Sequence, residues 1–183
     1  ARNFLFSELN IRGQHLQVAQ AWQAMIEDRH YTPALQTLLG ELTAMAILLA
    51  KGMKHPGRLT LQVQGKGPVS LLMVEVTDQL QLRGVAKTRG AIEPELAGIH
   101  DLLGDGQIMI TLENTVTNKL FQSYVLRQGD TVAECFTHYL SQSDQLPSKL
   151  WLAANEHAIA GLLIQKMPTT DEQDADGWER IAA

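Results

Sequence analysis

The amino-acid sequence predicts an α+β fold, in which a mostly antiparallel sheet packs on one long, buried central helix with further flanking helices. Apolar and polar residues alternate from residue 59 to residue 64, with Leu59, Leu61 and Val63 on one face, as in a half-buried strand. Between Pro33 and Gly52 the apolar residues follow helical spacing, and in the second half they surround the whole helix. A helix of that kind is typical of a protein core.

The first fifty residues are expected to form an extended segment and two helices. Residues 4–18 are extended, and residues 19–28 carry apolar side chains at helical spacing. Thr32 and Pro33 form a helix start, with the threonine as N-cap and the proline at the first helical position, where its missing N–H costs nothing. The long helix therefore begins at Pro33.

A turn joins the first strand of the sheet to the second. Gly65 and Gly67 flank a lysine, and Pro68 follows. Glycine adopts positive φ without steric cost, whereas proline fixes φ and removes a hydrogen-bond donor, so these residues interrupt the sheet. In residues 69–76 both alternating sets of side chains are apolar, which predicts a strand covered on both faces.

The rest of the chain is expected to add short strands and helices to this core. After a third strand and a loop, the expected elements are a helical turn at residues 99–103, strands at 108–112 and 119–126, a helix capped by Asp130, and strands at 149–154 and 158–166.

Residues 1–168 are expected to form one domain, followed by an acidic linker in residues 169–183. Between Thr169 and Gly177 the chain has four carboxylates and no aliphatic side chain larger than alanine, as a solvated linker would. An amphipathic pattern then begins at Trp178, which we interpret as the start of a truncated linker helix.

Composition argues against two classes of partner. The net charge of −5, with 15 basic and 20 acidic residues, indicates neither a nucleic-acid-binding protein nor one that binds a membrane surface. Arg2 and Glu8 interrupt any secretory signal, and the longest uncharged apolar run, residues 44–50, is too short to span a bilayer. Cys135 is the only cysteine, so no internal disulfide forms, and a reducing, cytoplasmic location is expected.

No group of reactive side chains predicts catalysis. The glycines around Lys66 lack the spacing and the following helix of a phosphate-binding loop. The histidines are scattered and there is no second cysteine, so no metal site and no other cofactor is expected in these residues. Cys135 and His138 share a helix face, which leaves a thiol-dependent hydrolase as an alternative, but a cysteine beside the apolar Phe136 favours a buried, inert thiol.

Four segments, in order and spacing, resemble one known family. They are LQVQGKGP at residues 61–68, LRGVA at 82–86, QLPS at 145–148 and AGLLIQKMP at 160–168. Together they look like the landmarks of the thirty-three-kilodalton heat-shock protein family, the redox-regulated holdase chaperones of bacteria. Lys66 stands where the family often has aspartate, and Ala160 where it often has a glycine. The structural turn residues expected in these segments are Gly65, Gly67, Pro68, Gly84 and Gly161.

The resemblance implies a chaperone core separated from its redox switch. Family members continue through a helical linker into a small C-terminal domain, where four cysteines bind zinc when reduced and form disulfides when oxidised. Neither cysteine pair is in this sequence. Oxidation in the family ejects the zinc and exposes apolar surface, which holds unfolding clients without ATP. The family protein is typically a homodimer that can exchange segments between its subunits.

We therefore expect an ATP-independent holdase, not an enzyme, that binds unfolding proteins under heat and oxidative stress. A sheet with two apolar faces supports this independently, because surplus apolar surface drives self-association or capture of unfolded chains. The sequence does not identify the client-binding residues. The alternatives are a hydrolase that uses Cys135 and His138, and a purely structural dimerisation domain.

Overall fold

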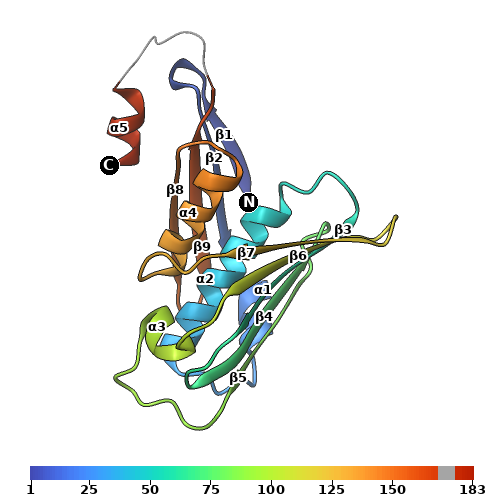
Figure 1. Ribbon diagram of the computed structural model, residues 1–183, viewed down its shortest axis with the longest axis vertical. Helices are drawn as coiled ribbons and strands as arrows, with labels where there is room; N and C mark the ends of the chain where they lie inside the picture. The colour runs from blue at the N-terminus through green and yellow to red at the C-terminus, as the bar shows by residue number, and fades with distance from the viewer. Residues whose placement is uncertain (169–175) are drawn as a thin grey trace.

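The structure, a computed structural model that describes residues 1–168 and 176–183, has one long helix between two antiparallel sheets (Figure 1). The strands are β1 (Arg2–Phe6), β2 (Ile11–Val18), β3 (Gly57–Gln64), β4 (Val69–Thr77), β5 (Leu82–Thr88), β6 (Ile108–Asn114), β7 (Lys119–Val125), β8 (Ser148–Ala154) and β9 (Ile159–Lys166). The helices are α1 (Gln20–Ile26), α2 (Pro33–Ala50), α3 (Gly98–Leu103), α4 (Val132–Ser143), α5 (Gly177–Ala182) and the 3₁₀ helix η1 (Ser7–Leu9).

The strands form two sheets rather than one. The four-stranded sheet has the order β1-β2-β9-β8, and the five-stranded sheet has the order β5-β4-β3-β6-β7. Every neighbouring pair is antiparallel. The predicted α+β class is therefore confirmed, and the segment expected to be extended over residues 4–18 is a hairpin that turns at η1.

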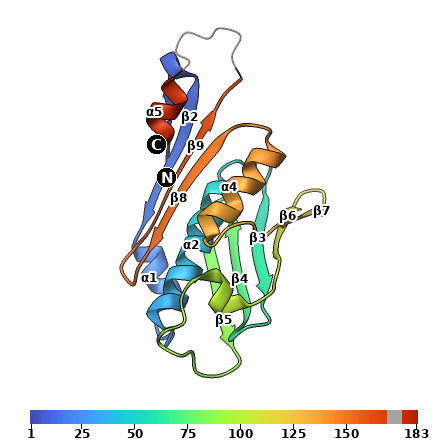
Figure 2. The ribbon, with the colours of Figure 1, turned by 60° about the vertical axis from the view of Figure 1, so that its left-hand side comes forward.

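Helix α2 is buried because a sheet lies on each side of it (Figure 2). The Thr32 hydroxyl accepts a hydrogen bond from the N–H of Leu35 at 3.4 Å, and the helix begins at Pro33 as predicted. Leu61 and Val74 of one sheet and Leu163 of the other belong to the same apolar core as α2. By length and hydropathy α2 also qualifies as a candidate membrane span, but 67% of that span is buried inside the fold.

The prediction that residues 69–76 form a strand covered on both faces is wrong. Leu72 and Val74 are buried toward α2, whereas Leu71 and Met73 on the other face of β4 stay partly exposed. The reason is the position of α2, which covers only the inner face of the five-stranded sheet. The outer face of that sheet is partly open.

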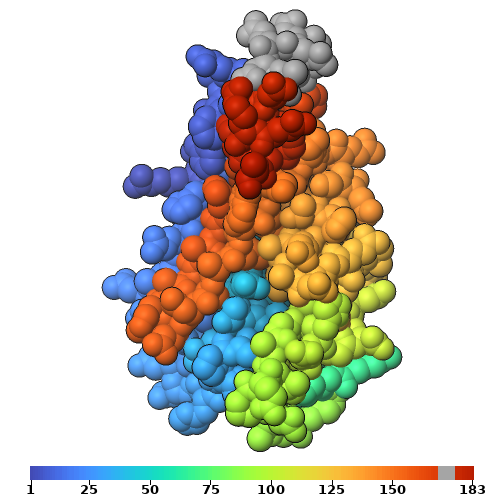
Figure 3. All heavy atoms as spheres, turned by 90° about the vertical axis from the view of Figure 1, so that its left-hand side faces the viewer, coloured from blue at the N-terminus to red at the C-terminus, as the bar shows by residue number. Residues whose placement is uncertain are grey.

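Strand β9, in contrast, is covered on both faces. Leu163 faces the α2 side, and Ile164 on the opposite face forms a small cluster with Ile11 and Ala182. Figure 3 shows α5, in red, lying against the blue N-terminal hairpin. The amphipathic pattern that begins at Trp178 is thus a short helix packed on the sheet, while the acidic segment expected at residues 169–175 lies outside the described residues.

The expected cap of the fourth helix is corrected by one residue. The Thr131 hydroxyl accepts a hydrogen bond from the N–H of Glu134 at 3.1 Å, and the Glu134 carboxylate accepts one from the N–H of Asp130 at 2.7 Å. Threonine and glutamate at this spacing satisfy two free N–H groups at the helix start. Asp130 is therefore the residue before the cap.

Gly65, Gly67 and Pro68 lie between β3 and β4, but positive φ is not the reason for the glycines. Neither glycine has positive φ. A Cβ on Gly65 would lie 2.2 Å from the carbonyl oxygen of Val69, and one on Gly67 would lie 2.8 Å from that of Leu102. The turn needs glycine because other backbone segments, including the end of α3, approach it closely.

The expectation that Gly84 and Gly161 are turn residues is wrong. Gly84 lies inside β5 and Gly161 inside β9. A Cβ on Gly84 would lie 2.9 Å from the Met25 sulfur, and one on Gly161 would lie 3.1 Å from a methyl carbon of Leu48. Both glycines therefore make room for helices, α1 at Gly84 and α2 at Gly161.

Candidate functional site

Strand β7 is an edge strand with mostly exposed side chains. It pairs only with β6, and the hairpin of these two strands extends beyond the rest of its sheet (Figure 1). Of nine exposed large apolar side chains among the described residues, five lie on or beside β7. These five, which we call the β7 strip, are Val116, Leu120, Phe121, Tyr124 and Leu126. An unpaired apolar edge of this kind is a template for pairing with another chain.

The exposure of the β7 strip follows from the limited reach of the core. Val125 and Phe121 lie on the same face of β7, yet Val125 is fully buried and Phe121 is 61% exposed. The core covers only the end of the hairpin that holds Ile108 and Val125. In the sequence, the signal for this surface is that both alternating sets of side chains in residues 119–126 contain large apolar residues. That pattern predicts a strand but not its exposure.

A groove of about 780 Å³ opens beside β7, between the two sheets. We call it the apolar groove. Its floor includes the last turn of α2, at Leu48 and Leu49. Its apolar walls include Phe4, Leu59, Ile110, Leu112, Phe121, Tyr139 and Leu163. Phe121 belongs to both features, so the groove meets the β7 strip at this side chain, whereas Leu120 and Tyr124 lie on the opposite face of β7.

One wall of the apolar groove is polar and well ordered by hydrogen bonds. The Arg12 guanidinium donates to Gln165 Oε1 at 2.8 Å. The amide of Gln165 donates to Asp144 Oδ2 at 2.9 Å and to Ser148 Oγ at 3.0 Å. Gln14 Oε1, also at the groove, is buried without a hydrogen-bond partner among the described residues. A buried acceptor without a donor is costly, so Gln14 favours a ligand that brings an N–H group.

The Cys135 and His138 pair that a hydrolase needs is not formed. Cys135 is fully buried, and the hydrogen-bond partner of its sulfur is the carbonyl oxygen of Gly129 at 3.9 Å. Burial raises the pKa of the Cys135 thiol, which disfavours the nucleophilic thiolate. His138 is exposed and lines a separate hollow with Glu41. In the described part of the chain, no group of three or more His, Cys, Asp or Glu residues has a geometry that would hold a metal ion.

Glu41 lies on α2 beside this hollow of about 440 Å³, which His138, Lys149 and Trp151 also line. Burial raises the pKa of Glu41 from 4.5 to about 7. The carboxylate of Glu41 is therefore half-protonated near neutral pH, whereas an exposed glutamate would be charged.

Replacing Glu41 with glutamine is expected to flatten the pH dependence of stability. The unfolded glutamate titrates near 4.5 and the folded one near 7, so the folded state binds more protons between these values. The contribution of Glu41 to stability is therefore complete below the unfolded-state pKa of 4.5, and it is lost as the pH rises through the folded-state pKa of about 7. Water in the hollow screens the charge of Glu41. Between about pH 5 and about pH 8 we therefore expect the free energy of unfolding of the native protein to fall by about 1 kcal/mol more than that of Glu41→Gln.

Urea unfolding at about pH 5 and about pH 8 measures this difference. The exposed Glu93 provides the matched control, because Glu93→Gln makes the same chemical change on the surface. Parallel stability curves for the native protein and Glu41→Gln would contradict the assignment.

Comparison with known proteins identifies the family. A family model described as Hsp33 protein matches residues 1–183. The chain belongs to the Hsp33 family. The 33 kDa chaperonin of Shewanella denitrificans is 39% identical over 173 residues, which are 94% of this chain and 59% of that relative. The 33 kDa chaperonin of Pectobacterium carotovorum is 36% identical over 183 residues, which are 98% of this chain and 62% of that relative.

A solved structure shares the fold of this Hsp33 chain. The crystal structure of the 33 kDa chaperonin homologue from Thermotoga maritima matches with a TM-score of 0.78 at 16% sequence identity, over 97% of this chain and 64% of that one. The chain thus spans about three fifths of the length of these relatives. The family expected from the four sequence segments and the α+β class expected from the residue patterns are both confirmed.

Proposed function

We propose that this Hsp33 chain is the client-holding core of an ATP-independent chaperone. The observation that carries the proposal is the gathering of exposed apolar side chains on one unpaired edge strand beside an apolar groove. Apolar surface of this kind is rarely left open on a protein without a binding partner. The relatives bear the name 33 kDa chaperonin, which agrees with a chaperone role.

An unfolding client would bind in an extended conformation along β7. The free N–H and C=O groups of this edge would pair with the client backbone, while its apolar side chains cover the β7 strip and enter the groove. A client N–H would supply the donor that Gln14 Oε1 lacks. Each Å² of apolar surface that a client buries contributes about 25 cal/mol to the free energy of binding. Because this burial itself drives binding, holding a client needs no ATP.

Regulation of this surface would reside in the remainder of the full-length protein. Cys135 is buried and single, so it is a poor redox sensor. We infer from family membership that a zinc-binding cysteine domain, linked to this core, controls access to the client surface. The same membership supports a cytoplasmic homodimer that exchanges segments between its subunits.

Light scattering of a heat-unfolding client enzyme tests the holding function. The folded chain, added without ATP at a concentration near that of the client, is expected to suppress the rise in scattering. The size of the chain, from multi-angle light scattering, is measured in parallel. A dimer that leaves client aggregation unchanged would support a purely structural dimerisation domain and overturn the proposal. If the chain showed a hydrolytic activity that Cys135→Ser abolished while client binding stayed unchanged, the hydrolase alternative would gain support.

A further inference from the structure

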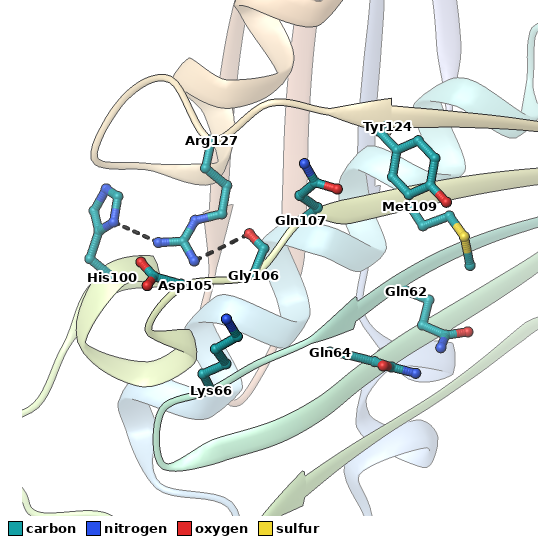
Figure 4. Close-up of a pocket in the computed structure, with 10 residues that line it drawn as sticks. All are labelled: Gln62, Gln64, Lys66, His100, Asp105, Gly106, Gln107, Met109, Tyr124 and Arg127. Atoms are coloured by element: carbon teal, nitrogen blue, oxygen red, sulfur yellow. Dashed lines mark hydrogen bonds between the residues drawn. The ribbon is translucent and has the colours of Figure 1, made fainter.

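A polar hollow of about 640 Å³ lies on the outer face of the five-stranded sheet, on the side away from α2 (Figure 4). Three glutamine side chains line it, at positions 62, 64 and 107. Lys66, from the turn between β3 and β4, and Arg127, from the segment after β7, point into it from opposite sides (Figure 4). Its volume falls within the range of small-molecule sites in proteins.

Arg127 is held by several hydrogen bonds at the wall of the hollow. Its guanidinium donates to the carbonyl oxygens of Gly104 and Gly106 and, at 2.6 Å, to Nδ1 of His100. His100 Nε2 lies 3.0 Å from the carbonyl oxygen of Gly129, so the ring fits a neutral form with Nδ1 as acceptor. Arg127 Nε is buried and has no hydrogen-bond partner among the described residues.

Arg89 is a third cation, and it lies beside the turn between β3 and β4 that carries Lys66. Arg89 donates to the carbonyl oxygen of Gly65 at 2.8 Å and to that of Gly67. Arg89 therefore holds the turn that carries Lys66, although Arg89 itself does not line the hollow, and Arg127 holds the neighbouring end of α3. None of these three cations forms an ion pair with a residue that the structure describes.

Few carboxylates offset these three cations. Asp105 is the one acidic residue that lines the hollow, and the nearby Asp130, whose Oδ1 lies 3.6 Å from His100 Nε2, is exposed outside it. In a chain with a net charge of −5, this is a local excess of positive charge. Lys66 and Arg127 outnumber Asp105 in the lining of the hollow, and a concave site with net positive charge attracts anions.

We propose that this hollow binds a small anionic molecule that carries a phosphate or a carboxylate group. The anionic group would approach the Lys66 ammonium in the field of Arg127 and Arg89. The three glutamine amides, which both donate and accept hydrogen bonds, would contact a polar body, and the Tyr124 ring at the same hollow offers a flat apolar surface.

A purely structural role explains the two arginines but not Lys66. Arg89 and Arg127 hold the carbonyl oxygens of the turn and of the α3 end, which packs against it. The Lys66 ammonium makes no hydrogen bond or ion pair with any described residue, although it lines the hollow. Lys66 is therefore the residue whose replacement separates a binding site from a structural clamp.

Isothermal titration calorimetry with inorganic phosphate and, separately, with citrate tests the proposal. We expect saturable binding of at least one probe, weakened about tenfold or more by Lys66→Gln, because a charge-assisted contact is lost. The control is Lys87→Gln, on the same sheet but outside the hollow, which is expected to change the affinity less than about twofold. Phosphate binding points to a phosphorylated ligand, and binding of citrate alone to a carboxylate ligand.

Two results would overturn the proposal. One is the absence of saturable binding of either probe up to about 10 mM, a concentration at which even a weak site fills. The other is an equal loss of binding in Lys66→Gln and Lys87→Gln, which would show a diffuse charge effect. Suppression of client aggregation is expected to stay unchanged in Lys66→Gln, since this residue lies outside the β7 strip and the apolar groove.

Discussion

Replacing Leu120 and Phe121 together with threonine is expected to raise the chain concentration needed for half-maximal suppression of client aggregation about tenfold. The two side chains are 62% and 61% exposed on an edge strand, so they are available to a client and contribute little to the core. Threonine suits a β-strand, so the free energy of unfolding is expected to change by less than about 0.5 kcal/mol. Light scattering measures the holding activity, and urea unfolding measures stability.

The chain provides a closely matched control for this double variant. Leu5 and Phe6 form the same dipeptide on β1, an edge strand of the other sheet, and are 64% and 44% exposed. Leu5→Thr with Phe6→Thr therefore makes the same chemical change, with a similar loss of exposed apolar surface, at a different place. If both double variants lost holding activity equally, clients would bind by total apolar area, and the assignment to β7 would be wrong.

Replacing Gly40 with valine is expected to destabilise the fold by about 3 kcal/mol. Gly40 lies inside α2, where a Cβ would stand 2.4 Å from the Cβ of Ala154 and 2.9 Å from a methyl carbon of Ile159. The four-stranded sheet therefore has no room for a side chain at this position. Because α2 is wedged between two sheets, moving it away from one clash disturbs the packing on its other side.

Urea unfolding at neutral pH measures the effect of Gly40→Val. The control is Gly90→Val, because a Cβ on Gly90 would have no atom within 4 Å and the glycine does not have positive φ. Helix propensity alone predicts a slight gain of a few tenths of a kcal/mol for valine over glycine inside a helix. A stability equal to or above that of the native protein would contradict the packing seen here.

Much of the local structure was predictable from the sequence, because its signals are short in range. The Thr32 and Pro33 pair marks the start of α2, and the observed N-cap bond is the one this pair predicts. The alternation over residues 59–64 specifies β3, and the turn after it has the expected residues. For α4 the same reasoning was off by one residue, since Asp130 and Thr131 are both good caps and only the observed geometry selects Thr131.

The functional surface was less predictable, because exposure depends on which distant element arrives as a cover. Leu71 and Met73 on β4 and Ile164 on β9 are all apolar residues in strands that have two apolar faces. The first two stay partly exposed, whereas Ile164 is buried in a cluster with Ala182 of α5 and with Ile11, which comes from the other end of the chain. The same limitation applies to Phe121, whose sequence pattern resembles that of a buried strand residue.

By itself, the sequence determined most helix and strand positions, the family, and the presence of more apolar surface than one helix can cover. Only the tertiary structure decided that the strands divide into two sheets around α2, that Gly84 and Gly161 make room for helices, and that the uncovered apolar surface lies along β7. The physical reason is one of range. Backbone periodicity and capping act over a few residues, whereas burial is set by contacts between different elements, some of which, such as β2 and β9, lie more than a hundred residues apart.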